Sequence, residues 1–327
     1  MNNNVSLILQ ALLAIAIGSG GVIAIFYGLN ILVEKLFPQE TRRKVLPWIY
    51  VGPSILLLGA YLVLPTIRTI YLSFFNKDST EFVGLQNYVF AFTAPDMLIA
   101  FRNNLLWLVL VTGVSVGLGL IIAVLVDRVK YEPLAKSLIF LPMAISFVGA
   151  SVIWRFIYAY RPVGSEQIGL LNAIVTSFGF EPVGWLVNRG INNFALIVIM
   201  IWLQTGFCMV LLSSAVKGVP KDVIEAARVD GAGEVQIFRR IIVPMIMPTV
   251  TVVSTTVIVL VLKVFDIVFV MTGGNLQTDV IASRMVREMF NFRNFGRGSA
   301  IAVILLVAVI PVMVANIRRF SQQEANR

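Results

Sequence analysis

The 327-residue sequence contains no histidine and a single cysteine, Cys208. One cysteine cannot form an intrachain disulfide, and a metal site built from His or several Cys ligands is excluded. The lack of histidine also removes Ser-His-Asp and Cys-His nucleophile sets. No Gly-rich loop of the form G-x-x-x-x-G-K-[ST] occurs, so the chain has no such loop for ATP phosphates. These absences predict a protein that is not an enzyme and carries no cofactor of its own.

Charged residues are scarce as well, at 13% of the chain, whereas 58% is hydrophobic and the mean hydropathy is +0.89. This composition is far more apolar than that of a soluble domain. About 20 apolar residues span the bilayer core as a helix, and seven runs approach or exceed this length: residues 5–33, 46–65, 104–126, 137–158, 194–216, 249–271 and 299–316. The sequence therefore predicts an all-α, polytopic integral membrane protein with about seven transmembrane helices.

The net charge of +9 reflects membrane topology and does not indicate nucleic-acid binding, because the basic residues lie between the apolar runs instead of forming one patch. Alternate connections carry 15 and 9 Lys and Arg residues, and the richer set comprises residues 35–44, 128–136, 217–240 and 318–327. The richer side is expected to be cytoplasmic. This places the N-terminus outside and the C-terminus inside.

The runs and their connections suggest three parts. We expect an extra N-terminal transmembrane helix with a basic cytoplasmic linker (1–45), a core of six transmembrane helices (46–320) and a cytoplasmic tail (321–327). The first run follows uncharged residues and precedes basic ones, which is the opposite of a signal peptide. The external segments 76–102 and 162–193 mix aromatic and polar residues and are expected to hold short helices.

The longest cytoplasmic connection, residues 217–248, has the pattern of a helix, a turn and a second helix. Pro220 suits a first helical turn, and Asp222 places negative charge near the positive end of that helix. Asp230 and Gly231 supply a stop, because glycine takes the left-handed conformation that ends helices. The small side chains of Ala226, Ala227 and Ala232 would let another protein approach closely.

This connection resembles the signature of inner-membrane permeases of binding-protein-dependent ABC importers, which runs E-A-A, three residues, G, nine residues, I, one residue, L-P. The matching positions are Glu225, Ala226, Ala227, Gly231, Ile241 and Pro244, with Val243 in place of Leu. The resemblance implies the type I permease fold in a bacterial inner membrane. It also implies that the loop couples to an ATPase through Glu225, Ala226, Ala227, Asp230, Gly231 and Ala232.

The same resemblance implies an assembly with a second permease subunit, two ATPase subunits that bind ATP and Mg²⁺, and an external solute-binding protein. Two other interpretations stay open. The loop could be a solvated helical hairpin, and the chain could be a self-contained secondary transporter or channel whose basic loop anchors to anionic lipid.

Further stretches resemble the carbohydrate branch of these permeases: F-V-G-L-Q-N-Y at 82–88, L-P at 141–142, I-W-R at 153–155, G-L-L-N at 169–172 and T-G-G at 272–274. Asn275 and Leu276 replace the family's usual Gly-Pro, so the shape of that loop is open. Residues 142–186 look most similar to permeases for α-glucosides, including glucosylglycerol, sucrose and trehalose. The resemblance thus implies a small neutral sugar-like substrate.

A neutral polyol needs hydrogen-bonding groups and aromatic faces in a water-accessible cavity near the middle of the bilayer. Gln204 and Phe207 share one helix face and are candidate solute contacts, the alternatives being an interhelical hydrogen bond and core packing. Lys263 and Asp266 would line the cavity, or form a structural pair near the outer interface with the Lys reaching outward. Trp154 could stack on a sugar ring or be an interfacial belt residue.

Overall fold

The computed structural model describes residues 2–127 and 129–325, and within these ranges the regular structure is helical apart from one isolated bridge between Phe75 and Phe82. The chain divides into two compact units, Met1–Arg68 and Thr69–Arg327. The described residues include six helices long and apolar enough to cross a membrane, or seven if one bent helix pair counts as a single span. This confirms the all-α, polytopic class expected from hydropathy.

The first unit is a pair of apolar helices, α1 (Asn2–Leu36) and α2 (Gln39–Leu58). α2 continues through a π turn (Gly59–Val63) into α3 (Leu64–Leu72), within which the first unit ends at Arg68. Pro65 follows the π turn by two residues, and its missing N–H removes one helical hydrogen bond. Arg42 pairs with Glu34 at 2.9 Å and joins the two helices. Nearly all the apolar side chains of this unit whose exposure is described are exposed, which suits contact with lipid.

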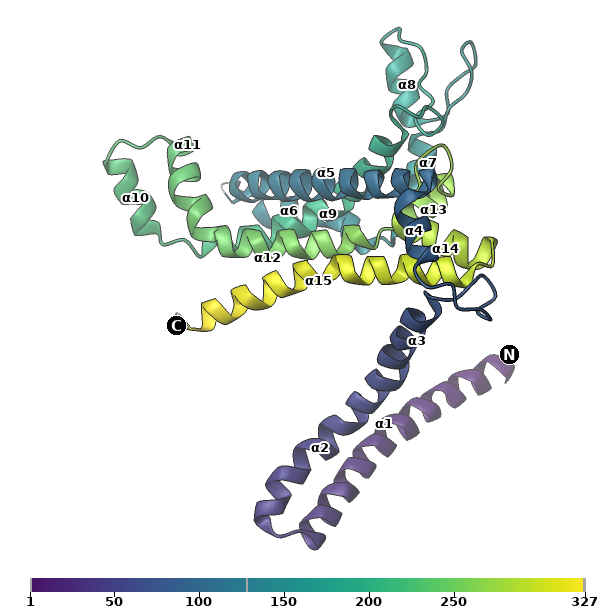
Figure 1. The fold of residues 1–327 in the computed structure, drawn as a ribbon. Helices are drawn as coiled ribbons and strands as arrows, with labels where there is room; N and C mark the ends of the chain where they lie inside the picture. The colour runs from purple at the N-terminus through teal and green to yellow at the C-terminus, as the bar shows by residue number, and fades with distance from the viewer. Residues whose placement is uncertain (1, 128, 326–327) are drawn as a thin grey trace. The chain divides into compact units, whose positions relative to one another are not determined.

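The second unit is a bundle whose long helices are α5 (Pro95–Val126), α9 (Asn192–Lys217), α12 (Val243–Leu262) and α15 (Phe295–Ala325) (Figure 1). The core lies mainly between α5, α9 and α12, where Trp107, Met200, Leu203 and Val257 are buried. Gly119 of α5 makes this packing close: a Cβ there would lie 2.6 Å from Cys208 Cβ of α9.

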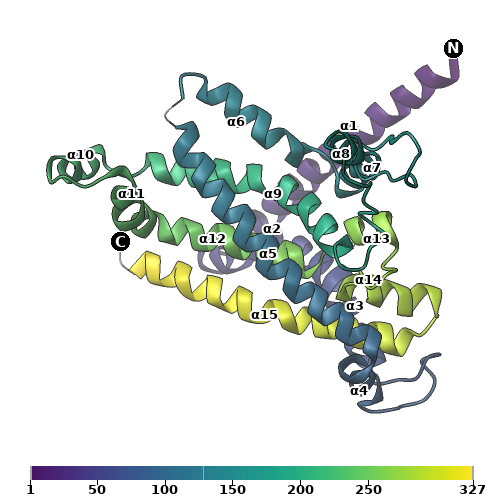
Figure 2. The same ribbon diagram turned by 90° about the horizontal axis from the view of Figure 1, so that it is seen from above.

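Short helices occupy the two opposite ends of this bundle, as Figures 1 and 2 show. One end carries α10 (Lys221–Val229), α11 (Glu234–Ile237) and the π turn Phe238–Ile242. The other carries α4 (Gln86–Thr93), α7 (Phe147–Ile157), α8 (Leu170–Ser177), α13 (Asp266–Thr272), α14 (Ile281–Val286) and the π turn Arg287–Asn291. α4 and α8 confirm the short helices expected in segments 76–102 and 162–193.

The fourth apolar run differs from the continuous span expected over 137–158. It consists of α6 (Glu132–Phe140), a 3-10 turn (Leu141–Ala144) and α7, and the two parts are bent by 101°. Pro142 ends α6 because it cannot continue the hydrogen-bond ladder. The Ser146 hydroxyl then accepts a hydrogen bond from the Gly149 N–H and caps the start of α7.

The sixth apolar run is also shorter than the expected 249–271. α12 ends at Leu262, Lys263 follows it as the C-cap, and Asp266 opens the separate helix α13. Lys263 and Asp266 therefore do not lie on one continuous helix, and the described structure contains no ion pair between them. Hydropathy alone missed this break because apolar residues continue on both sides of it.

The loop after α13 is held in a tight conformation by the bundle around it. Gly273, Gly274, Leu276 and Gln277 all have positive φ, from 54° to 74°. Asn103 of α5 donates to the carbonyls of Gln277 and Asp279 at 2.7 and 2.8 Å. Burial raises the pKa of the Asp279 carboxyl above its ordinary value, although the Arg287 guanidinium lies 3.6 Å away. The replacement of Gly-Pro by Asn275 and Leu276 is thus accommodated by left-handed backbone at Leu276.

Candidate functional site

Residues 217–248 form the expected helical hairpin. Pro220 precedes α10, Asp222 lies in its first turn, and Gly231 ends it in the left-handed conformation with φ +84°. The Ala232 N–H donates to the Ala227 carbonyl at 2.9 Å, and Arg228 pairs with Glu234 at the same distance. The turn is therefore closed by its own backbone and one ion pair, and α10 is presented at the end of the bundle.

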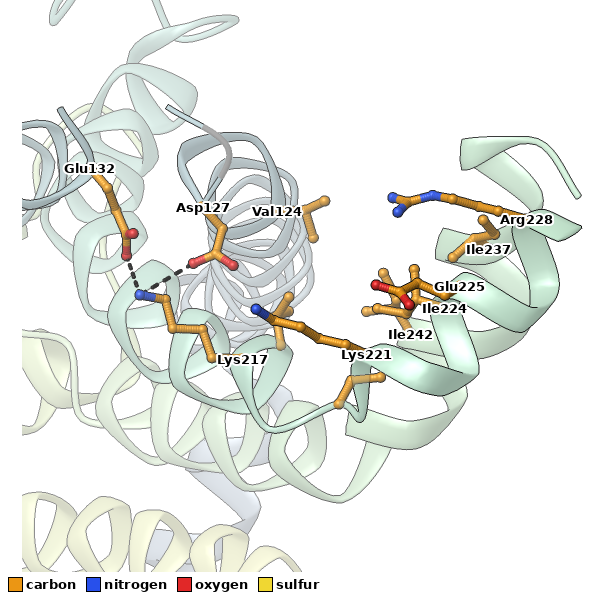
Figure 3. Close-up of a pocket in the computed structure, with 12 residues that line it drawn as sticks. Val124, Asp127, Glu132, Lys217, Lys221, Ile224, Glu225, Arg228, Ile237 and Ile242 are labelled. Atoms are coloured by element: carbon orange, nitrogen blue, oxygen red, sulfur yellow. Dashed lines mark ion pairs between the residues drawn. The ribbon is translucent and has the colours of Figure 1, made fainter. Parts of the chain in front are cut away.

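The two faces of α10 have different surroundings. Lys221, Ile224, Glu225 and Arg228 point into a cavity of about 530 Å³ between α10 and the ends of α5 and α9 (Figure 3). The opposite face is open to solvent, and Val229 is 88% exposed. Val223 and Val235 of the same hairpin are exposed as well, at 41% and 67%, so the hairpin presents more than one apolar side chain to its surroundings.

The six predicted coupling residues divide between these surroundings. Four of them are exposed, namely Glu225, Ala226, Asp230 and Gly231, and of these Glu225 also lines the cavity. The other two, Ala227 and Ala232, pack against the small core around Ile237. Val229 is the exposed residue that sequence reasoning missed. Its signal was an apolar side chain directly before the Asp-Gly turn. Contact with an ATPase by any of these residues stays a prediction.

A cluster of charges closes the same cavity on the side of α6, and we call it the Glu132 clasp: Asp127, Glu132, Lys136, Ser213 and Lys217. Lys217, the last residue of α9, pairs with Glu132 at 2.5 Å and lies 3.5 Å from Asp127 (Figure 3). Lys136 of α6 bonds both Glu132 and the Ser213 hydroxyl of α9. These pairs join residues up to 90 positions apart, so the sequence did not reveal them.

A second cavity, of about 490 Å³, lies in the middle of the bundle at the α6–α7 bend. Its polar groups come from Ser146, Gln204, Thr256 and Asp266, and its apolar wall consists of Met143, Ile145, Phe147, Val148, Leu203, Phe207 and Leu260. The volume is in the range of small-molecule sites, which are largely apolar with few polar groups. The structure thus brings together three of the five predicted solute-contact residues.

Gln204 is the best-placed of these polar groups. It is 5% exposed, and its amide forms no hydrogen bond with the described residues, so the interhelical hydrogen bond considered from the sequence is not present. The Asp266 carboxylate likewise forms no ion pair or hydrogen bond within the described chain. Buried polar groups are normally satisfied. The buried Gln204 amide and the half-buried Asp266 carboxylate are therefore available to a ligand in this cavity.

Lys263 and Trp154 do not line this cavity. Lys263 is exposed at the end of α12, and within the described residues it does not form the structural pair with Asp266 that was the alternative to cavity lining. Trp154 packs edge-on against Trp202 at 5.8 Å and tilts against Tyr158 at 5.1 Å. Ser146 and Thr256 were not predicted. The sequence shows each of them only as a hydroxyl residue within an apolar run. Such hydroxyl groups usually donate to a carbonyl of the preceding helical turn, as Thr256 does to the Val252 carbonyl, so they did not indicate a site.

Residues 115–325 match the model of the family described as "Binding-protein-dependent transport system inner membrane component". This match covers more than half of the chain. The chain belongs to this family. It is thus a multi-pass translocation subunit of an inner membrane transport system, which confirms the resemblance found at residues 225–244.

Curated relatives agree with this assignment. The chain is 74% identical to "Osmoprotective compounds uptake permease protein GgtC" of Synechocystis sp., over 85% of this chain and 100% of that protein. It is 45% identical to "Alpha-glucoside transport system permease protein AglF" of Rhizobium meliloti, over 97% of this chain and 98% of that protein. A solved bacterial importer of the acidic polysaccharide alginate has the same fold, with a TM-score of 0.73, 22% identity and coverage of 86% and 98%.

Proposed function

We propose that this permease is one membrane-spanning subunit of an ATP-driven importer of sugar-like compatible solutes of the α-glucoside class, such as glucosylglycerol, sucrose or trehalose. The names of GgtC and AglF support this solute class. The observation that carries the proposal is the mid-bundle cavity, in which the Gln204 amide and the Asp266 carboxylate have no partner among the described residues.

The chemistry of the cavity suits a neutral polyol. An amide both donates and accepts hydrogen bonds, and a carboxylate accepts them from hydroxyl groups. Phe207 offers an aromatic face, and Ser146 and Thr256 add two hydroxyl groups to the lining. A binding site near the middle of the bilayer, beside a broken helix, is the arrangement that transporters commonly use.

The assembly would contain a second permease subunit, two ATPase subunits and an external solute-binding protein. The binding-protein partner is supported by a solved bacterial alginate ABC transporter in complex with its alginate pentasaccharide-bound periplasmic protein, which has the same fold with a TM-score of 0.74 and 20% identity. ATP and Mg²⁺ would be held by the ATPase. The coupling hairpin and C-terminus would face the cytoplasm and the N-terminus the outside, as the Lys and Arg distribution favours.

The test is uptake of labelled glucosylglycerol into proteoliposomes that contain the full complex. Gln204→Ala should raise the KM of uptake about fivefold, because a hydrogen bond to a neutral group contributes about 1 kcal/mol. Gln86→Ala, which removes an exposed amide on α4, is the matched control and should leave KM unchanged. ATPase co-purification should be normal in both variants.

Two results would contradict the proposal. Uptake that continues without ATP would favour a self-contained secondary transporter. An unchanged KM in Gln204→Ala, together with no inhibition of uptake by sucrose or trehalose, would remove the cavity and the solute class from consideration.

A further inference from the structure

The Glu132 clasp occupies a position that links the two cavities. α6 starts at Glu132 in the clasp and runs directly to Met143, which lines the mid-bundle cavity. α9 carries Gln204 in that cavity and ends at Lys217 in the clasp. Only three residues, 218–220, separate Lys217 from the coupling helix α10.

A second contact holds α6 against α9 closer to the solute cavity. Gly206 of α9 faces the backbone of α6, and a Cβ at this position would lie 2.8 Å from Phe140 Cα. α6 is therefore attached to α9 at two points, at Gly206 and at the clasp. Opening the clasp would leave the packing around Gly206 in place and would release the end of α6 near α10.

Several charges act together at the end of α6 that carries the clasp. Glu132 lies at the positive end of α6 and Lys217 at the negative end of α9, so each charge is stabilised by the dipole of its own helix. The Glu132 and Lys136 side chains are 23% and 19% exposed, so water screens them only partly. Asp127 adds a second carboxylate within 3.6 Å of both ammonium groups.

We infer that Glu132 and Lys217 are positioning residues for transport: they make α6 move with α9 and the coupling helix, so that this wall of the solute cavity shifts as one body. The inference rests on the proposed function, because it assigns these residues a part in ATP-driven uptake. α12 supplies the opposite wall through Thr256 and Leu260, and the Glu132 clasp does not include it.

A coupling role and a purely structural role of the clasp predict different effects of opening it. Partly exposed ion pairs contribute little to stability, about 0–1 kcal/mol, so opening the clasp should leave the fold and the ATPase attachment intact. What it should change is the number of solute molecules imported per ATP hydrolysed. That ratio distinguishes a coupling residue from a stabilising one.

The experiment measures ATP hydrolysis and uptake of labelled glucosylglycerol in proteoliposomes with the complete transporter. Glu132→Gln and Lys217→Met should each lower uptake per ATP about five- to tenfold, and the double variant should be no worse than either single one, since contacting residues are not additive. Lys217→Arg should retain coupling because its guanidinium can reach both carboxylates. Glu34→Gln, which opens the separate Arg42 pair, is the matched control and should behave as wild type.

Several results would overturn the inference. One is wild-type uptake per ATP in both Glu132→Gln and Lys217→Met. Another is loss of the ATPase subunits from both variants, which would make the clasp a structural support. Absence of ATP-driven uptake in the wild-type complex would instead refute the proposed function, so the two failures are distinguishable.

Discussion

Two glycines on α5 provide a controlled test of how closely the central helices pack. Gly119 is buried against α9, and a Cβ added there would lie 2.6 Å from Cys208 Cβ and 2.9 Å from the Met209 nitrogen. Gly117, two residues earlier on the same helix, has nothing within 4 Å of the position that a Cβ would take. The same substitution, glycine to alanine, should therefore have opposite effects at these two positions.

The magnitude follows from the distances. Carbon atoms in contact prefer about 3.5–4.0 Å, so Gly119→Ala would force α5 and α9 apart by roughly 1 Å. Overpacking of this kind costs about 1–3 kcal/mol, and the gain in helix propensity returns about 1 kcal/mol. Gly117→Ala has only the gain in helix propensity, because its Cβ meets no neighbouring atom. We expect Gly119→Ala to be about 1–3 kcal/mol less stable than Gly117→Ala.

The assay is the apparent melting temperature of each purified variant in detergent, followed by uptake in proteoliposomes. Gly119→Ala should melt several degrees below Gly117→Ala and show reduced uptake, because α9 carries Gln204 and leads to the coupling helix. Equal melting temperatures would refute the close approach of α5 and α9. A lower melting temperature for Gly117→Ala would do so as well.

Three further predictions concern the ends of the bundle. Gly274→Ala should lower the melting temperature, because its φ is +74° and a Cβ would lie 2.6 Å from an Asp279 oxygen; Gly164→Ala, with φ +87° in open space, should cost less. Because the pKa of Asp279 is raised, its stabilising contribution is complete below its ordinary value of 3.8 and is lost as pH rises through the raised pKa. Wild type should therefore gain stability over Asp279→Asn on acidification, and parallel melting curves would contradict this. Val229→Asp should abolish ATPase co-purification, whereas the same change at Val187, an exposed valine in the segment between α8 and α9, should not.

Much of the fold could be predicted because hydropathy and helix punctuation are local properties. The spans were found from apolar length, and the hairpin at 217–248 from Pro220, Asp230 and Gly231, each of which acts within one turn. Gln204 and Phe207 reach one cavity because their i, i+3 spacing fixes a shared face.

The remainder could not be predicted because it depends on contacts between distant segments. The Glu132 clasp joins Glu132 to Lys217, and neither residue has a local pattern that indicates the other. The breaks at Pro142 and Lys263 lie within runs that stay apolar. Hydropathy reports how apolar such a run is, and it does not report whether the helix continues in one direction. The exposed face of α10 was also not predicted, because the signature names residues without stating which of them pack inward.

The break in the fourth apolar run explains why a cavity exists where a solute site was expected. Backbone that leaves a helix at membrane depth is tolerated only where it is buried in protein or faces water, since lipid cannot satisfy its N–H and C=O groups. The break between α6 and α7 contributes Met143, Ile145 and Ser146 directly to the mid-bundle cavity. It also directs the positive end of α7 toward that space, where solute hydroxyl groups can accept hydrogen bonds. A continuous helix over 137–158 would have satisfied its own backbone and closed this wall, so the bend that contradicts the predicted span supports the predicted site.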